Sequence, residues 1–278
     1  MLPLQFSELP GWLPFGDAVE AVLIPEPGRT TLCVSSQVGC ARGCAFCLTA
    51  TMGLSRNLAA EEIVAQVHRA LAVAKEEGLP PLRNIVFMGM GEPLDNWASV
   101  EASLRALVDG RGFGFGPRHV TVSTVGPSPR AIARLVACPT RIAWSLHAAD
   151  DATRRGLVAT QRHPVTDLRD AFAEVFRARR APLFVELTLI EGVNDAPADA
   201  EAAAALLADV PTEVRFNLLP MNPTGRDLRP SPPARVDAFA GTLRRAGHFT
   251  MVRQARGQDE SAACGQLATL PAPARREA

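Results

Sequence analysis

The sequence contains no tyrosine, only one lysine (Lys75) and no excess of either charge, with 29 basic and 29 acidic residues. A formal net charge of zero gives the whole chain no attraction to nucleic acid, although a local basic patch could still bind it. No apolar run approaches the ~20 residues of a membrane span, and the run 202–208 is about the longest. An apolar fraction of 47% excludes a mainly disordered chain.

The beginning of the chain does not resemble a secretion signal. Residues 1–16 contain Glu8 and three prolines, whereas a signal peptide begins with basic residues that an apolar stretch follows. We therefore expect a cytoplasmic protein. In that compartment the six cysteines are expected to be metal ligands or catalytic groups rather than structural disulfides.

Short apolar runs alternate with helical patterns along the 278 residues. The runs 20–24 and 30–35 flank Pro25-Glu26-Pro27-Gly28 and predict a β-hairpin. Further strands are predicted at 84–88, 119–123, 141–146, 183–190, 213–218 and 249–253, and helices at 60–77, 98–109, 128–137, 165–179, 197–207 and 233–246.

This alternation predicts an α/β fold, because parallel strands need helical crossovers. Six strand–helix units from residue 30 onward predict a partial (β/α)6 TIM-like barrel with an N-terminal β-hairpin extension. We expect residues 1–35 to form the extension, 36–267 the core and 268–278 a disordered tail. In such barrels the active site lies at the carboxyl ends of the strands.

Three of the cysteines, Cys40, Cys44 and Cys47, follow the first core strand in a CxxxCxxC pattern. Three thiolates on one tight loop can bind three irons of a 4Fe–4S cubane and leave the fourth iron open to a small molecule. Gly39 and Gly43 allow the loop to bend around the cluster. A zinc site is the alternative, but it usually uses four protein ligands. The spacing therefore favours the iron–sulfur cluster.

An aromatic residue, Phe46, precedes the last cysteine, and the pattern resembles the radical S-adenosylmethionine (SAM) superfamily. Further motifs narrow the resemblance to the RlmN/Cfr RNA methyltransferases and extend it over nearly the whole chain. They are Thr31-Leu-Cys-Val-Ser-Ser-Gln-Val-Gly-Cys40, Arg56-Asn-Leu58, Gly89-Met-Gly-Glu-Pro-Leu94, Ser145-Leu-His147, Gly192-Val-Asn-Asp195, Asn222-Pro223 and Ala262-Ala-Cys-Gly-Gln-Leu267.

The resemblance implies an enzyme with a 4Fe–4S cluster that uses SAM twice. One SAM methylates a cysteine near the C-terminus, and another yields a 5′-deoxyadenosyl radical that activates this methyl group. The methyl group is then transferred to carbon 2 or 8 of an adenosine in ribosomal or transfer RNA. Ordinary SAM alkylation fails at such an electrophilic carbon, and radical chemistry carried by cofactors avoids the problem. The resemblance also implies an electron donor such as flavodoxin or ferredoxin; we expect a monomer that binds no membrane.

The family's catalytic residues match positions in this chain. Cys264 matches the methylated cysteine, and Cys33 matches the resolving cysteine that releases the product and forms a disulfide with it. Glu20 matches the proposed base that removes a proton from the adduct, with Glu26 as a weaker candidate. The alternatives without function are a buried strand cysteine, a free surface thiol and an exposed glutamate. Cys138 has no counterpart and is assigned to packing.

The SAM-binding residues of the family also match positions in this chain, and these positions lie near the ends of predicted strands. The resemblance implies that the SAM-binding residues are Phe46, Gly91, Glu92, Ser123, Ser145, Leu146, His147 and Asn222. The resemblance implies that Gly91 allows the backbone to approach SAM closely, and that the Glu92 carboxylate accepts hydrogen bonds from the ammonium group of SAM.

The chain departs from the family pattern at several places. It begins shortly before Glu20, so we expect the family's additional N-terminal helical domain to be absent or truncated. Ala159-Thr160-Gln161 stands in place of Pro-Ile-Asn, and Met221 in place of tryptophan. The segment 48–54 is intermediate between the two subfamilies, which leaves carbon 2 and carbon 8 open.

Contact with RNA is predicted from arginines expected near the barrel rim, since guanidinium groups bind phosphates and stack on unpaired bases. A solvated arginine-rich face is the alternative. These residues are Arg154, Arg155, Arg162, Arg177, Arg179 and Arg180.

Two other functions remain open. One is a radical SAM enzyme that acts on a small molecule or peptide. The other is a non-catalytic iron–sulfur or zinc module that binds RNA or a partner. The pair Cys33 and Cys264 argues against the first, because hydrogen abstraction alone needs neither thiol. The SAM-pocket motifs argue against the second.

Overall fold

The computed structural model describes residues 1–5, 17–224, 227–253 and 264–268. Within these ranges, nine strands form one open sheet in the order β1-β2-β3-β6-β7-β8-β9-β10-β11. Pairing is antiparallel from β1 to β3 and parallel from β3 onward. The strands are β1 (Leu2–Gln5), β2 (Glu20–Glu26), β3 (Arg29–Cys33), β6 (Leu82–Phe87), β7 (Val120–Thr124), β8 (Arg141–Ser145), β9 (Leu183–Leu189), β10 (Val214–Pro220) and β11 (Phe249–Val252).

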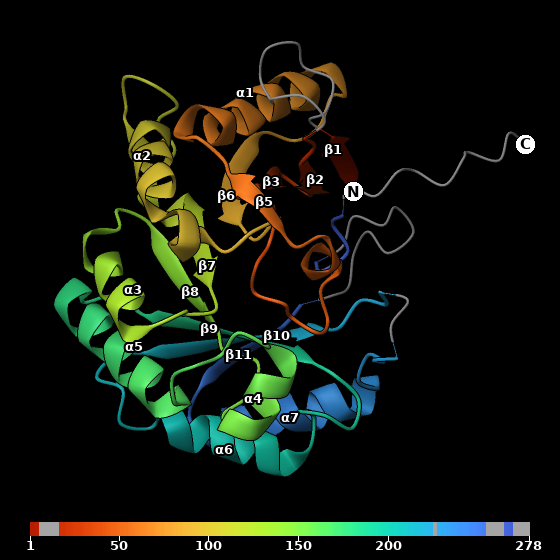
Figure 1. Cartoon of the computed structure of the whole chain (residues 1–278), viewed down its shortest axis with the longest axis vertical. Coiled ribbons are helices and arrows are strands. Elements are labelled where there is room, and N and C mark those ends of the chain that lie inside the picture. The colour runs from red at the N-terminus through yellow and green to blue at the C-terminus, as the bar shows by residue number, and fades with distance from the viewer. Residues whose placement is uncertain (6–16, 225–226, 254–263, 269–278) are drawn as a thin grey trace, which may run out of the picture.

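Helical crossovers join the parallel strands, and most of the helices lie around the outside of the curved sheet (Figure 1). The α-helices are α1 (Ala60–Glu76), α2 (Trp97–Val108), α3 (Pro129–Ala133), α4 (Asp151–Leu157), α5 (Val165–Arg179), α6 (Pro197–Leu207) and α7 (Pro233–Arg245). The 3-10 turns are η1 (Leu48–Met52), η2 (Pro93–Asn96), η3 (Pro117–His119) and η4 (Arg134–Ala137). Within the described ranges, none of the helices has the length and apolar character that a membrane span requires.

The predicted partial barrel with an N-terminal hairpin is confirmed. In the part of the chain that the structure describes, the sheet does not close, because β1 and β11 lie at its two edges. The hairpin is continuous with the barrel, since β3 pairs with β2 on one side and β6 on the other. The predicted division at residue 35 stays a prediction, and residues 269–278 of the predicted tail lie outside the described residues.

Several elements differ from the sequence prediction. The predicted helix 128–137 divides into α3 and η4, and it ends before Cys138 because Pro139 disfavours helical geometry in the residue that precedes it. Helix α4 and strand β1 were not predicted. Nor was the two-stranded sheet of β4 (Gln37–Gly39) and β5 (Leu54–Asn57), whose strands are too short for a periodic pattern.

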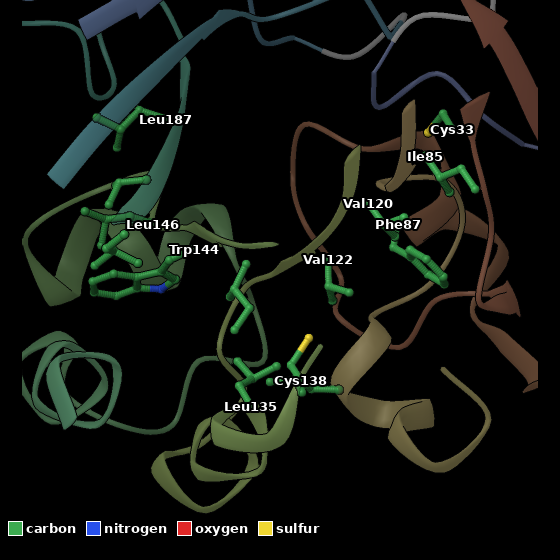
Figure 2. Packing of buried hydrophobic residues seen from close by; sticks show 14 of the residues in the cluster. Cys33, Ile85, Phe87, Val120, Val122, Leu135, Cys138, Trp144, Leu146 and Leu187 are labelled. Atoms are coloured by element: carbon green, nitrogen blue, oxygen red, sulfur yellow. The ribbon is translucent and has the colours of Figure 1, made fainter. Parts of the chain in front are cut away.

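A continuous hydrophobic core fills the space between the sheet and its helices. Figure 2 shows Cys33 beside Ile85 in one part of this core and Cys138 beside Leu135 in another. Both cysteines are buried. The structure therefore agrees with a packing role for Cys138, whereas Cys33 lies at the last position of β3, at the carboxyl edge of the sheet.

We expect Asn96→Ala to lower the free energy of unfolding by about 1–3 kcal/mol. The buried Asn96 amide donates to the carbonyls of Ser36 (2.8 Å) and Leu58 (2.7 Å) and so joins η2 to both flanks of the cysteine loop. Alanine would leave both carbonyls without this donor. Urea unfolding measures the change, and Arg105→Ala on exposed α2 surface is the control, with an expected change below about 0.5 kcal/mol. Equal stability of the two variants would contradict this.

Candidate active site

The loop with Cys40, Cys44 and Cys47 lies at the carboxyl edge of the sheet, and the pair β4–β5 closes its base. The Cys40 amide donates to the Gly53 carbonyl over 2.7 Å. A β-carbon at Gly39 would lie 1.9 Å from that same carbonyl oxygen. Glycine at position 39 is therefore required for this close approach.

Segments that are distant in sequence hold the rest of this loop. The Arg42 guanidinium forms an ion pair with Asp95, 2.6 Å apart. The Ala45 amide donates to the carbonyl of Leu157 (2.9 Å) and the Leu48 amide to that of Gly265 (2.7 Å). The positions of the three thiols therefore depend on tertiary contacts more than on the loop itself.

The three thiols are partly buried and influence one another. Burial raises the pKa of Cys40 to about 11, and the neighbouring Glu92 and Cys47 act in the same direction. Burial also raises the pKa of Cys44, and nearby Cys47 and Cys40 add to this effect. A group bound here must therefore supply positive charge that keeps the thiolate forms stable, as iron does.

The described His, Cys, Asp and Glu side chains contain no group of three or more that could hold a single metal ion. Zinc requires all its ligands at about 2.0–2.3 Å from one ion. In a cubane each thiolate binds a different iron, so the sulfurs stand further apart. The donor set itself, three free thiols on one loop, matches the 4Fe–4S prediction, in which one iron has no protein ligand.

Gly91 and Glu92 lie where β6 turns into η2. Gly91 has a φ of +100°, and a β-carbon there would lie 2.7 Å from Cβ of Gln37. The buried Glu92 carboxylate accepts from the Thr124 hydroxyl (2.5 Å) and from the amides of Val125 and Leu94 (3.0 and 2.9 Å). Only one of these bonds is to Oε2, so that oxygen keeps capacity for a further donor such as an ammonium group.

Ser123, next to the last residue of β7, and Ser145, the last residue of β8, lie beside the buried Glu186 carboxylate. Their hydroxyls lie 2.8 Å apart, and Ser123 also donates to Oε2 of Glu186 over 2.7 Å. Oε1 of Glu186 has no hydrogen-bond partner among the described residues. A buried acceptor without a partner is unfavourable, so this oxygen is suited to receive a donor from a bound molecule.

His147 has a strained, left-handed backbone with a φ of 62°. Asn194 stabilises this conformation because its amide donates to the His147 carbonyl over 2.6 Å. The amide of Thr188 donates to Nδ1 over 3.2 Å, which places the ring proton on Nε2. The ring packs edge-on against Phe46, with 4.6 Å between centroids. Burial, with help from the charge of Arg154, lowers the pKa of His147 to about 3, so the ring is neutral.

The segment 264–268 runs across the carboxyl edge beside the cysteine loop. A β-carbon at Gly265 would lie 3.1 Å from the Phe46 carbonyl oxygen, and Gly265 has a φ of +81°. The Thr49 hydroxyl donates to the carbonyl of Leu267 over 2.6 Å. The amide of Asn222 donates to the carbonyl of Cys264 over 3.0 Å. Cys264 is thereby positioned between the cysteine loop and the end of β10.

Glu20 and Cys33 approach this segment from the other side. Oε2 of Glu20 accepts the amide proton of Ala268 over 3.1 Å. Burial raises the pKa of Glu20, and the Ala268 amide partly opposes the shift. Burial raises the pKa of the Cys33 thiol first, and the nearby Cys264 raises it further. Both cysteines are free thiols, and Cys264 is the more exposed of the two.

Two residues from the sequence prediction lie apart from this arrangement. Glu26 pairs in register with Arg29 at the amino end of β3, the opposite edge of the sheet from Glu20. The Leu146 side chain is fully buried in the core, and its backbone bonds to Glu186 and Arg154. A SAM contact by Leu146 stays a prediction.

The structure corrects the expectation that all six arginines lie near the barrel rim and are available to RNA. Arg154 has no exposed surface. Arg179 donates to the carbonyls of Leu135, Cys138 and Thr140. Arg177, Arg179 and Arg180 lie at the end of α5, which leads into the amino end of β9 and so lies away from the active-site edge. Arg155 and Arg162 remain, both exposed in the connection that follows β8.

Three residues of the site escaped the sequence prediction. Glu186 lies within the apolar strand β9, and a single acidic residue in such a strand was the sequence feature that could have indicated a functional role. Asn194 belongs to the motif Gly192-Val-Asn-Asp195, but its contact with His147 forms only when the chain folds. Arg253 follows β11, and its positive charge lowers the pKa of both Cys33 and Cys264 against the effect of burial.

Comparison with known proteins agrees with this geometry. A model of the radical SAM superfamily matches residues 34–204. The chain is 46% identical to a dual-specificity RNA methyltransferase RlmN of Anaeromyxobacter sp. (strain Fw109-5), over 93% of this chain and 70% of that protein. The chain belongs to the RlmN family of the radical SAM superfamily.

Two further relatives support the assignment to the RlmN family. A probable RNA methyltransferase of Sorangium cellulosum (strain So ce56) is 49% identical over 92% of this chain, which spans 64% of that protein's length. The crystal structure of a radical SAM methyltransferase from Sphaerobacter thermophilus has a TM-score of 0.86 and 44% identity, over 91% of this chain and 74% of that one.

Radical SAM enzymes carry a 4Fe–4S cluster and use SAM, and the residues of this RlmN-family chain fit both groups. Cys40, Cys44 and Cys47 would hold the cluster. The buried acceptors of Glu92 and Glu186 face the same edge, and the second has an oxygen without a described partner. The individual SAM contacts stay predictions.

Serine in place of Cys40, Cys44 or Cys47 is expected to leave less than about a tenth of the wild-type iron after anaerobic reconstitution, since each change removes one thiolate ligand. Iron and sulfide analysis with visible absorption measures this. Cys138→Ala is the control and should retain full iron, because Cys138 lies in the core. Full iron in Cys44→Ser, or one tightly bound zinc in the wild-type chain, would contradict the assignment.

Because the pKa of folded His147 is about 3 instead of 6.5, the unfolded chain binds an extra proton below about pH 6.5. The free energy of unfolding should therefore fall as the pH drops from about 7 to 5, by at most about 1.4 kcal/mol per unit from this ring. Urea unfolding of wild type and His147→Asn across this range tests it, since asparagine tolerates the positive φ. Identical slopes would show that His147 does not contribute.

Proposed function

We propose that this chain is a radical SAM RNA methyltransferase that methylates carbon 2 or 8 of an adenosine in ribosomal or transfer RNA. The observation that carries the proposal is the position of Cys264, which lies beside the cluster loop and within electrostatic reach of Cys33. The bond from Ala268 to Glu20 brings a carboxylate to the same segment. The names of the RlmN-family relatives support RNA as the substrate.

When bound, the cluster and SAM supply a 5′-deoxyadenosyl radical, and a further SAM supplies the methyl group. Cys264 carries that methyl group on its sulfur and presents it to the adenine. The Glu20 carboxylate, with its raised pKa, accepts the proton from the adduct carbon, and the excess electron of the adduct would return to the cluster. Cys33 then forms a disulfide with Cys264: an S–S bond forms as the S–C bond to the product breaks, and the thiol proton of Cys33 passes to the released carbon to complete the methyl group.

The remaining partners are proposals of the same kind. A target adenine must leave its stack to reach Cys264, as in base flipping. The exposed Arg155 and Arg162 follow β8 at the active-site edge, where guanidinium groups can bind phosphates. A flavodoxin or ferredoxin would supply electrons to the cluster. We propose that the chain acts as a cytoplasmic monomer.

A radical SAM enzyme that acts on a small molecule or peptide is the competing function. Such an enzyme needs the cluster and SAM, but it needs neither a methyl-carrying thiol nor a resolving thiol. Some contacts of segment 264–268 also support the cluster loop and would serve either function. The bond from Ala268 to Glu20 and the proximity of Cys264 to Cys33 favour methyl transfer through the protein.

The test uses the cluster-loaded chain with methyl-labelled SAM, a reductant and total RNA, followed by mass spectrometry of the nucleosides. We expect labelled 2-methyladenosine or 8-methyladenosine from the wild type, and a loss of about a hundredfold or more in Cys264→Ala, because the covalent carrier is removed. Cys138→Ala should retain activity, and both variants should retain the cluster absorption.

Undiminished methylation by Cys264→Ala would overturn the proposed route. Cleavage of SAM by the wild type without any labelled methyladenosine would instead favour the small-molecule or peptide function.

A further inference from the structure

Arg154, on α4 near the active-site edge, is an arginine without exposed surface, although the family motifs assign it no role. An arginine is almost never fully buried unless its charge and its donors are satisfied. Its neighbour Arg155 is exposed. The two adjacent residues therefore have the same side chain in opposite environments.

The three arms of the Arg154 guanidinium reach three different segments. Nε donates to the Leu146 carbonyl after β8 over 2.8 Å, and one terminal nitrogen donates to the Val125 carbonyl after β7 over 2.6 Å. The other terminal nitrogen donates to the side-chain oxygen of Gln161. Each nitrogen therefore has one acceptor, and because all three acceptors are neutral, these hydrogen bonds do not compensate the positive charge.

The segment held through Gln161 is packed against the cluster loop. The Ala45 amide donates to the Leu157 carbonyl over 2.9 Å, and Cys44 and Val158 form an isolated β-bridge. The Thr160 hydroxyl donates to the Arg42 carbonyl over 3.1 Å. Residues 157–160 thus contact residues 42–45 as a continuous brace.

A thiolate at Cys44, the form that binds iron, acts electrostatically on Arg154. Burial lowers the pKa of Arg154 to about 10, and a negative charge on Cys44 opposes this more strongly than Asp151 or Glu92 does. The guanidinium therefore stays positive at neutral pH. Because the site is buried, solvent and salt screen this attraction weakly.

We propose that Arg154 is a positioning residue for the 4Fe–4S cluster. Its forked hydrogen bonds fix residues 157–161 against the Cys44 side of the loop and so slow the loss of iron. Its charge stabilises the cluster more in the reduced state, which carries one more negative charge, and so raises the reduction potential. The proposal depends on the cluster and not on the RNA substrate.

The experiment compares wild type, Arg154→Gln, Arg154→Lys and Arg155→Gln after anaerobic reconstitution, without SAM or RNA. Iron transfer to a chelator gives the rate of cluster loss, and redox titration monitored by electron paramagnetic resonance gives the midpoint potential. The exposed Arg155→Gln variant removes the same charge from the next position and should change neither quantity.

For Arg154→Gln we expect iron loss about ten- to a hundredfold faster than in the wild type and a lower midpoint potential. Arg154→Lys keeps the charge and loses the fork, so it should lose iron faster while its potential stays close to that of the wild type. These combined results would separate the role of the charge from that of the hydrogen bonds.

Wild-type rates and potential in Arg154→Gln would overturn the proposal, and so would an effect of Arg155→Gln as large as that of Arg154→Gln. If Arg154→Gln does not fold, Arg154→Lys and Gln161→Ala decide the outcome. Both variants must then lose iron faster than the wild type. Iron retention equal to that of the wild type in both would overturn the proposal that residues 157–161 hold the cluster loop in place.

Discussion

The positioning of three thiols on a loop with little structure of its own is the constraint on which the rest of this molecule depends. Within the loop, a hydrogen bond joins the Cys47 amide to the Cys44 carbonyl. Its other support comes from Gly53, Leu157 and Gly265, and from the ion pair with Asp95. Loss of packing at any of these places would move the cluster ligands, so folding and cofactor binding are closely linked.

The site also joins segments from the beginning and the end of the barrel. Glu20 and Ala268 are 248 positions apart in sequence, and a hydrogen bond brings them together at the mouth of the barrel. Since β2 pairs antiparallel with β3, Glu20 stands at the same edge as Cys33, while Glu26 stands at the opposite edge. The register of this hairpin thus places one glutamate at the active-site edge and the other away from it.

Buried charge is concentrated at the carboxyl edge of the sheet. Glu92 and Glu186 are buried carboxyl groups there, Arg154 is cationic, and His147 is neutral because burial lowers its pKa. Their hydrogen-bond partners come from neighbouring segments. Such groups are unfavourable in the absence of partners, so their presence indicates a site that is completed by bound molecules.

The sequence by itself determined the alternation of strands and helices, the partial barrel and the CxxxCxxC loop, because periodicity and local motifs act over short distances. It did not reveal β4 and β5, which are too short to show a period, nor the division of the helix predicted at 128–137 into α3 and η4. Tertiary structure alone decided that Arg154 is buried behind the cluster loop while Arg155 is exposed, and that segment 264–268 lies against Glu20. The reason is physical: burial and partnership of a charge depend on segments that meet only when the chain is folded.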